Sequence, residues 1–163
     1  MVLLAWLGEY PALPALIAAA LCGAMLGFAP SNRPVAKVFL GDVGSLPIGL
    51  LLGWCLLQLA FHHHLIAALL LPLYYLTDAT VTLLRRMARR EPFWAAHRSH
   101  FYQQATDNGF AVRQVVAEIF ALNVVLAALA IVSVMTSDAV GVLMLVLGIA
   151  AVTAVLFHFS RKR

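Results

Sequence analysis

The sequence predicts an all-α, polytopic transmembrane helical bundle with an amphipathic cytoplasmic loop. Of its 163 residues, 63% are hydrophobic and 11% are charged, and the mean hydropathy is +0.93. A soluble domain of this size is far less apolar. The apolar runs are long and lack the alternation of polar and apolar residues that a membrane β-barrel needs, so we expect the spans to be helices.

Five apolar stretches approach or reach the length of about 20 residues that a spanning helix requires. We expect spans at residues 11–29, 46–61, 65–84, 114–135 and 139–159, preceded by the remnant of another span at the N-terminus. The chain 1–163 is then a single transmembrane domain. Residues 30–45 and 85–113 form its two long polar loops.

The basic residues assign a side of the membrane to these loops. All 11 Lys and Arg residues fall on one side of the five-span arrangement, in loops 30–45 and 85–113 and in the C-terminal tail. Because short loops rich in Lys and Arg stay in the cytoplasm, we place both loops and the C-terminus there. The net charge of +4 describes a basic rim that favours anionic lipid headgroups and anionic substrates, and we expect no nucleic-acid partner.

The stretch VFLGDVGSLPIG sets one carboxylate, Asp42, between two glycines just before an apolar run. Ser45 is a good N-cap, so we expect a helix to begin there. Gly41 and Gly44 let the backbone approach a ligand closely or adopt a positive φ. A carboxylate suits Mg²⁺ and the free N–H groups of a helix N-terminus suit phosphate, so the stretch predicts a metal-diphosphate site. A plain Gly-Asp turn between two spans is the alternative.

Asp78 lies at the cytoplasmic end of the third expected span. An ionisable residue within a membrane segment is costly, and this makes Asp78 a functional candidate. The alternative is a local ion pair with Arg85 on the same helix face.

The long loop carries the sequence HRSH, formed by His97, Arg98, Ser99 and His100. On a helix, His97 and His100 would share a face. No acidic or Cys partner stands at a spacing that would support zinc, whereas Arg and His both donate well to phosphate oxygens. This segment has two interpretations: a phosphate-contacting loop, or a simple basic surface cluster.

Taken together, these segments resemble the polyprenyl-phosphate N-acetylhexosamine-1-phosphate transferases of glycosyltransferase family 4, which include the phospho-N-acetylmuramoyl-pentapeptide transferase. VFLGDVGSLPIG resembles the metal-aspartate motif of the family. DATVTLLRRMARREPFWAAHRSHFYQ resembles the segment that ends in its histidine-rich cytoplasmic loop. HRSHFYQ, in place of a His-x-His-His pattern, is similar to the O-antigen and capsule-initiating branch.

The resemblance implies transfer of an N-acetylhexosamine-type sugar-1-phosphate from a UDP-sugar to undecaprenyl phosphate. UMP is released, and the reaction belongs to cell-envelope polysaccharide biosynthesis, including lipopolysaccharide, at the bacterial inner membrane. Mg²⁺ is the implied cofactor, bound by Asp42. The resemblance implies Asp42, His97 and His100 as catalytic groups and Arg98 as a substrate-binding group. The arguments from the residues themselves add Gly41, Gly44, Ser45 and Asp78 as substrate-binding groups.

One part of the family pattern is missing from this sequence. Family members carry an Asp-Asp pair and an Asn-rich motif in earlier spans, and this chain has no Asp-Asp pair. We therefore expect the C-terminal portion of such an enzyme, active with a separate N-terminal half or within a longer chain, and a homo-oligomer is a further candidate. The alternative is a catalytically inert membrane subunit or pseudoenzyme that binds a partner or lipid phosphate. A small transporter that uses Asp78 ranks last.

Overall fold

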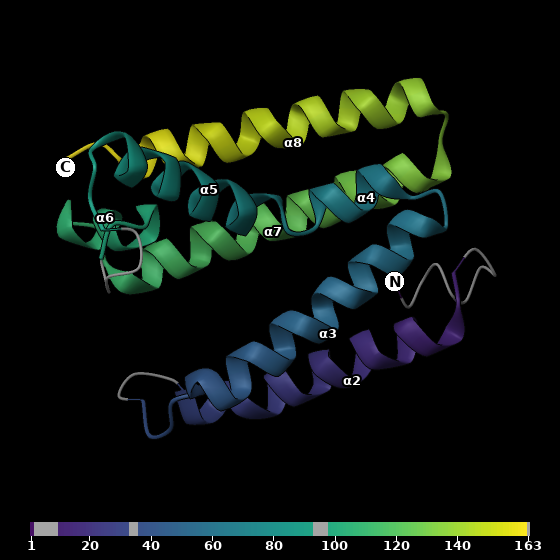
Figure 1. Ribbon diagram of the computed structural model, residues 1–163, viewed down its shortest axis with the longest axis horizontal. Coiled ribbons are helices and arrows are strands. Elements are labelled where there is room, and N and C mark those ends of the chain that lie inside the picture. Colours follow the sequence, from purple (N-terminus) through teal and green to yellow (C-terminus); the bar gives the residue numbers. More distant parts are fainter. Residues whose placement is uncertain (2–9, 33–35, 93–97, 163) are drawn as a thin grey trace. The chain divides into compact units, whose positions relative to one another are not determined.

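The computed structural model describes Met1 and residues 10–32, 36–92 and 98–162, and all the regular structure in these ranges is helical (Figure 1). Four segments are long and apolar enough to cross a membrane, and they coincide with the first, second, fourth and fifth expected spans: Ala12–Asn32, Gly41–Phe61, Val112–Met135 and Asp138–Phe159. The helices in chain order are α2 (Ala12–Phe28), the short 3-10 helix η1 (Ala29–Asn32), α3 (Gly41–Phe61), α4 (Leu65–Leu70), α5 (Leu73–Ala88), α6 (Phe101–Asp107), α7 (Val112–Met135) and α8 (Asp138–Phe159).

The third expected span, residues 65–84, is not one continuous helix. It is divided into α4 and α5 by a turn at Leu71 and Pro72. Pro72 has no N–H to donate to the preceding turn, and its ring clashes with that turn's carbonyl group, so the helix breaks there. That α4 and α5 cross the membrane together stays a prediction.

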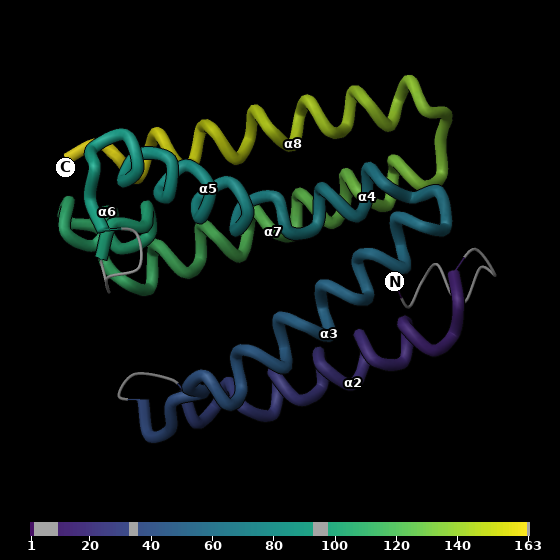
Figure 2. The backbone as a smooth tube through the Cα atoms, viewed as in Figure 1, coloured from purple at the N-terminus to yellow at the C-terminus, as the bar shows by residue number. Residues whose placement is uncertain are grey.

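The contacts divide the chain into two compact units, Met1–Ala68 and Leu69–Arg163. In the first unit, α2 and α3 pack side by side (Figure 2). The phenol of Tyr10 donates a hydrogen bond to the Cys55 carbonyl oxygen at 2.7 Å, and the Cys55 thiol donates to the Pro14 carbonyl oxygen at 3.5 Å. Burial raises the pKa of Tyr10 to about 12, so the phenol keeps its proton further into the alkaline range than an exposed tyrosine does.

In the second unit, α7 and α8 form an antiparallel hairpin, and α5 and α6 pack against it (Figure 1). The Asn108 side-chain amide, at the end of α6, donates a hydrogen bond to the Phe159 carbonyl oxygen at 2.8 Å and so fixes α6 to the end of α8. The core of this unit contains the fully buried side chains of Leu70, Tyr74, Leu126, Val152 and Phe159.

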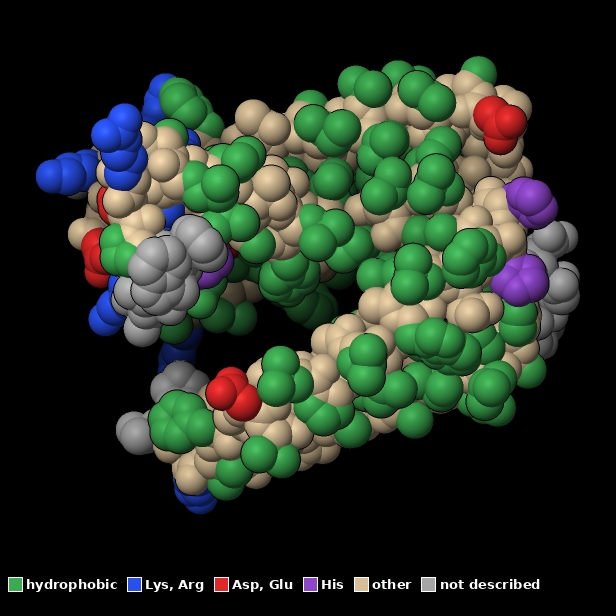
Figure 3. All heavy atoms as spheres, viewed as in Figure 1, with side chains coloured by type: hydrophobic (Ala, Val, Ile, Leu, Met, Phe, Trp, Pro, Cys, Tyr) green, Lys and Arg blue, Asp and Glu red, His purple; other side chains and the backbone are tan. Residues whose placement is uncertain are grey.

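The surface of the second unit is divided by polarity (Figure 3). Its flanks along α7 and α8 are largely apolar, whereas Lys and Arg side chains gather at the end where α5 finishes and α6 lies. Apolar patches of this extent on a soluble monomer are rare, so these flanks suit contact with lipid. The exposed apolar side chains include Val116, Phe120, Val124, Val142, Val146 and Ile149.

Gly148 gives a test of the packing of this unit. A Cβ atom at Gly148 would lie 2.5 Å from Leu70 Cδ2 and 3.3 Å from Leu126 Cδ2, and both leucines are fully buried. We expect Gly148→Ala to lower the free energy of unfolding by about 1–3 kcal/mol through overpacking. The measurement is thermal unfolding in detergent.

Gly23→Ala is the matched control, because no heavy atom lies within 4 Å of a Cβ atom built at Gly23 in α2. Alanine is the better helix former, so this change should leave stability unchanged or slightly raised. Equal losses in the two variants would contradict the packing described for Gly148.

Candidate functional site

Asp42 lies in the first turn of α3, which begins at Gly41. The prediction that Ser45 caps this helix is wrong, because Ser45 lies inside it. Gly41 adopts a φ of +60°, which costs glycine little and lets the chain enter the helix early. The side chain of Leu40 then folds over the first turn, since a Cβ atom at Gly44 would lie 2.7 Å from Leu40 Cγ. Gly44 therefore makes room for Leu40.

The Asp42 carboxylate is exposed, and it makes no hydrogen bond or ion pair with another residue in the described ranges. In an α-helix the first N–H groups have no partner within the helix, and the dipole favours negative charge at this end. Both oxygens of the Asp42 carboxylate are thus open to a cation. The exposed Ser45 hydroxyl lies on the next turn of the same helix end.

Asp78 is in α5, and its side chain is engaged by three groups of the second unit. Its Oδ1 atom accepts hydrogen bonds from the Thr82 hydroxyl at 3.2 Å and from the backbone N–H of Phe101 at 3.0 Å. The same atom lies 3.5 Å from Nδ1 of His100. Asp78 is 4% exposed, so these contacts replace the water that a carboxylate would otherwise hold. The carboxylate therefore joins α5 to the start of α6.

His100 lies just before α6 in an extended conformation, as its N-cap residue. Its backbone N–H donates to Oε1 of Gln103 at 3.3 Å, which closes a capping box. Arg98 is exposed, and its guanidinium lies 3.9 Å from the Asp107 carboxylate. His97 lies outside the described residues. Because His100 precedes the helix, the expectation that HRSH presents one helical face does not apply to it.

Asp78 and Arg85 do not form the ion pair that the sequence offered as an alternative. Arg85 places its guanidinium carbon 4.6 Å from the centre of the Phe101 ring, whereas Asp78 pairs with His100. A guanidinium over an aromatic face is a favourable cation–π contact. Phe101 is therefore held by its backbone N–H on Asp78 and by its ring under Arg85.

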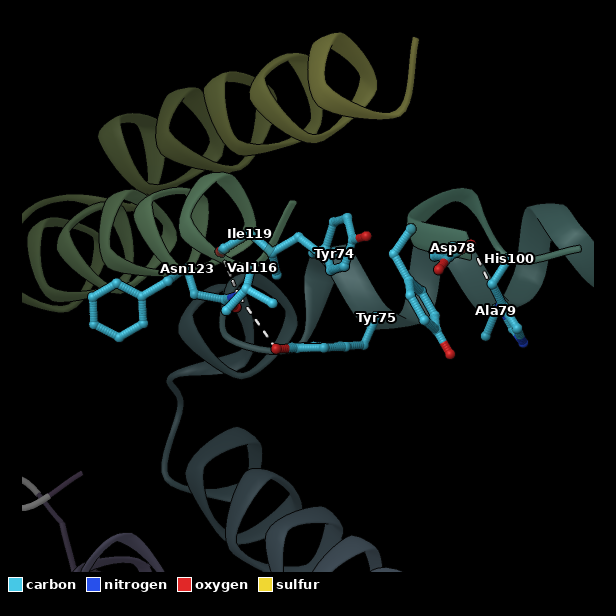
Figure 4. A pocket seen from close by; sticks show the side chains of 10 residues that line it. Tyr74, Tyr75, Asp78, Ala79, His100, Val116, Ile119 and Asn123 are labelled. Carbon is cyan, nitrogen blue, oxygen red and sulfur yellow. Dashed lines mark hydrogen bonds and ion pairs between the residues drawn. The ribbon is translucent and has the colours of Figure 1, made fainter. Parts of the chain in front are cut away.

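A pocket of about 580 Å³ opens beside Asp78 and His100 (Figure 4). Two tyrosines of α5 line it, and Asn123 of α7 donates to the Tyr75 hydroxyl at 3.4 Å. The remaining wall is largely apolar, with a polar end where Asp78 and His100 meet. Its lining residues are Tyr74, Tyr75, Asp78, Ala79, His100, Tyr102, Val116, Ile119, Phe120 and Asn123.

The structure thus brings Asp78 and His100 together and places Arg98 on the same segment, while Asp42, Gly41, Gly44 and Ser45 share the start of α3. That these two groups form one site stays a prediction. Sequence reasoning missed Thr82, Gln103 and the Phe101 N–H. Thr82 stands one helical turn after Asp78, a spacing at which side chains on a helix meet, so it could have been found.

The chain was compared with known proteins. The model of Glycosyl transferase family 4 matches residues 1–60, which include the Asp42 motif. A phospho-N-acetylmuramoyl-pentapeptide-transferase of Bartonella quintana is 32% identical over 116 residues, covering 69% of this chain and 31% of the relative. A decaprenyl-phosphate N-acetylglucosaminephosphotransferase of Mycobacterium tuberculosis is 31% identical over 126 residues, covering 68% of this chain and 31% of the relative. The chain belongs to glycosyl transferase family 4.

A shorter match within the family is closer in sequence. The decaprenyl-phosphate N-acetylglucosaminephosphotransferase of Mycolicibacterium smegmatis is 57% identical over 44 residues, 27% of this chain and 10% of that protein. No solved structure matches the chain. The chain spans about 31% of the length of the B. quintana and M. tuberculosis relatives.

Asp42 fits a magnesium ion as one ligand of a shared site. Mg²⁺ is usually held by one or two carboxylates together with substrate phosphates and water, so a single open carboxylate suits it. Within the described part of the chain, no cluster of three or more His, Cys, Asp or Glu residues could hold a metal ion. The remaining ligands would come from the substrate, from water or from further protein residues.

The link from Asp78 to α6 can be tested by amide hydrogen exchange. Asp78→Ala removes the acceptor of two buried donors, which costs about 1–3 kcal/mol for each unsatisfied group. We expect faster exchange at the Phe101 amide and through α6. Asp78→Asn keeps an acceptor oxygen and should show a smaller change.

Asp107→Asn is the control, because Asp107 is exposed at the end of the same short helix. It should leave exchange at Phe101 unchanged. If Asp78→Ala also leaves it unchanged, Asp78 does not hold α6 in place.

Proposed function

We propose that this chain serves in the transfer of an N-acetylhexosamine-type sugar-1-phosphate from a UDP-sugar to undecaprenyl phosphate. The observation that carries the proposal is the open Asp42 carboxylate at the N-terminus of a membrane-length helix, within the segment that matches the family model. In the reaction, an oxygen of the lipid phosphate attacks the phosphorus that bears the sugar. The bond from that phosphorus to the UMP oxygen breaks, and UMP leaves with the electron pair.

In this proposal the residues of α3 bind the diphosphate. Asp42 holds Mg²⁺, which would neutralise negative charge on the diphosphate oxygens. Gly41 leaves open space at the start of the helix, whose N–H groups face an anion favourably, and Gly44 contributes by accommodating Leu40. Ser45 adds a hydroxyl donor on the next turn.

The loop before α6 contributes cationic donors. Arg98 and His100, with His97, contact the phosphates of the nucleotide sugar through charge-assisted hydrogen bonds. Asp78 acts through His100: contact with its Oδ1 atom orients the imidazole ring by way of Nδ1. The apolar pocket that ends at this pair supports the proposal, because a lipid carrier needs an apolar groove beside its phosphate.

The location in this proposal is the bacterial inner membrane, with loops 30–45 and 85–113 and the C-terminus in the cytoplasm. The chain spans about 31% of the length of the B. quintana and M. tuberculosis relatives, so the proposed activity is that of a larger assembly: a longer polypeptide, or this chain with a separate N-terminal half. The O-antigen and capsule-initiating branch is proposed from HRSHFYQ.

The decisive experiment follows Mg²⁺-dependent transfer of radiolabel from UDP-N-acetylglucosamine to undecaprenyl phosphate in membranes. It uses this chain alone and with its upstream coding region restored. We expect Asp42→Asn to reduce the rate by at least about a hundredfold, because an amide does not replace the charge of a metal-binding carboxylate. Asp138→Asn is the matched control, since Asp138 also stands in the first turn of a membrane-length helix.

The outcomes of this assay distinguish the transferase hypothesis from that of an inert subunit. Loss with Asp42→Asn and retention with Asp138→Asn supports the proposal. Activity of the chain alone would show that no further half is required. Absence of transfer from any UDP-sugar tested, in both forms, would favour a catalytically inert subunit that binds a partner or lipid phosphate.

Arg98 gives a second prediction in the same assay. Within the part of the chain that the structure describes, its exposed guanidinium has one weak ion pair, with Asp107, so it is available to a phosphate. We expect Arg98→Gln to raise KM for the UDP-sugar about tenfold, as expected for one lost charge-assisted contact. Arg113→Gln, which removes another exposed charge, should change KM less than about twofold. Equal effects would assign Arg98 to the general charge of the surface.

A further inference from the structure

A second pocket, which we call the arginine pocket, lies at the end of α5 and has no role in the proposed transfer. It is about 200 Å³ in volume and is polar. Three guanidinium groups and one carboxylate line it, so its charge is clearly positive. The lining residues are Thr82, Arg85, Arg86, Arg89, Glu91, Ser99 and Gln104.

Arg86 is the unusual member of this group, because it is 7% exposed. Its Nη2 donates to the Pro92 carbonyl oxygen, and its Nη1 lies 3.7 Å from the Glu91 carboxylate. Its Nε is buried and has no hydrogen-bond partner among the described residues. Burying a guanidinium is costly unless its charge and donors are matched, so this position favours an additional anion nearby.

The other two arginines are only partly satisfied within the protein. Arg89 lies 4.0 Å from Glu91, the same carboxylate that Arg86 uses, and its side chain is 74% exposed. Arg85 is exposed and lies over the Phe101 ring. Among the described residues, one carboxylate therefore serves two guanidinium groups, and the third guanidinium group contacts an aromatic face instead of an anion.

Exposed apolar side chains accompany the arginines on α5. Leu83 and Leu84 precede Arg85, and Met87 follows Arg86; all three side chains are exposed, as suits contact with a lipid surface. Arginine at the end of such a helix is well placed for headgroup phosphates, which it can bind with two parallel hydrogen bonds. The volume of the pocket is sufficient for one phosphate group, not for a sugar nucleotide.

We propose that the arginine pocket binds a phosphate group, carried by an anionic lipid headgroup or by a soluble phosphate compound. Arg85, Arg86 and Arg89 supply the charge, and Thr82 and Gln104 border the site. The Gln104 side-chain amide donates to the Ser99 carbonyl oxygen at 2.6 Å, so the pocket wall includes residues on both sides of His100. A ligand here joins α5 to the His100 segment and restrains that segment.

The test is native mass spectrometry of the 163-residue chain in detergent, with two probes used separately: phosphatidylglycerol and inorganic pyrophosphate. Arg85→Gln/Arg89→Gln is the test variant, and Arg113→Gln/Lys162→Gln removes the same charge from exposed positions elsewhere. Circular dichroism checks that each variant keeps its helices. Arg86→Lys retains the buried charge and removes the fork of donors.

We expect wild type to bind at least one probe with a fixed stoichiometry. Affinity should fall about tenfold in Arg85→Gln/Arg89→Gln and in Arg86→Lys, and less than about twofold in the control. Binding of phosphatidylglycerol alone identifies a lipid headgroup as the ligand, and binding of pyrophosphate identifies a soluble phosphate. The proposal is overturned if neither probe binds, if both double variants lose affinity equally, or if Arg86→Lys binds like wild type. None of these results depends on transferase activity.

Discussion

The buried carboxylate of Asp78 is the interaction on which the second unit depends. A charge is expensive to bury, and here Oδ1 of Asp78 is compensated in part by a hydroxyl, a backbone N–H and an imidazole. The N–H belongs to Phe101, far along the chain, so this contact determines where α6 begins. The start of α6 in turn places His100 at the polar end of the large pocket. Thr82, which donates to Asp78, also lines the arginine pocket. One carboxylate thus organises the walls of both pockets.

The sequence predicted those helices that coincide with long apolar runs. Four of the expected spans match helices long enough to cross a membrane, because uninterrupted apolar runs have few other stable structures. The break at Pro72 was missed because average hydropathy does not register a missing N–H group. The start of α3 was placed too late because Ser45 is a good N-cap in general. The positive φ of Gly41 and the packing of Leu40 on Gly44 are local geometry that composition does not encode.

The candidate site was predictable in its charged members and unpredictable in their partners. Asp42, Asp78 and His100 stand out because polar groups beside apolar runs need a reason to be there. The partners of these residues could not be predicted from the sequence, because every residue except proline has a backbone N–H and nothing marks that of Phe101 as a donor to Asp78. The burial of Arg86 among otherwise exposed arginines is a tertiary effect of the same kind. Residue type indicated candidates, and packing decided which of them are engaged.

Asp42 and Asp78 are the same residue type, but their surroundings give them different roles. Asp42 lies in the first turn of α3, and Asp78 lies within α5. Asp42 is exposed with no partner among the described residues, and it lies at a helix N-terminus that favours the anion, so it can offer its oxygens to a cation. Oδ1 of Asp78 already receives several donors within the protein, so recruiting it to a metal would cost the contacts that hold α6. The same residue type therefore serves as a ligand in the proposed site where it is unsatisfied and as an anchor where it is not.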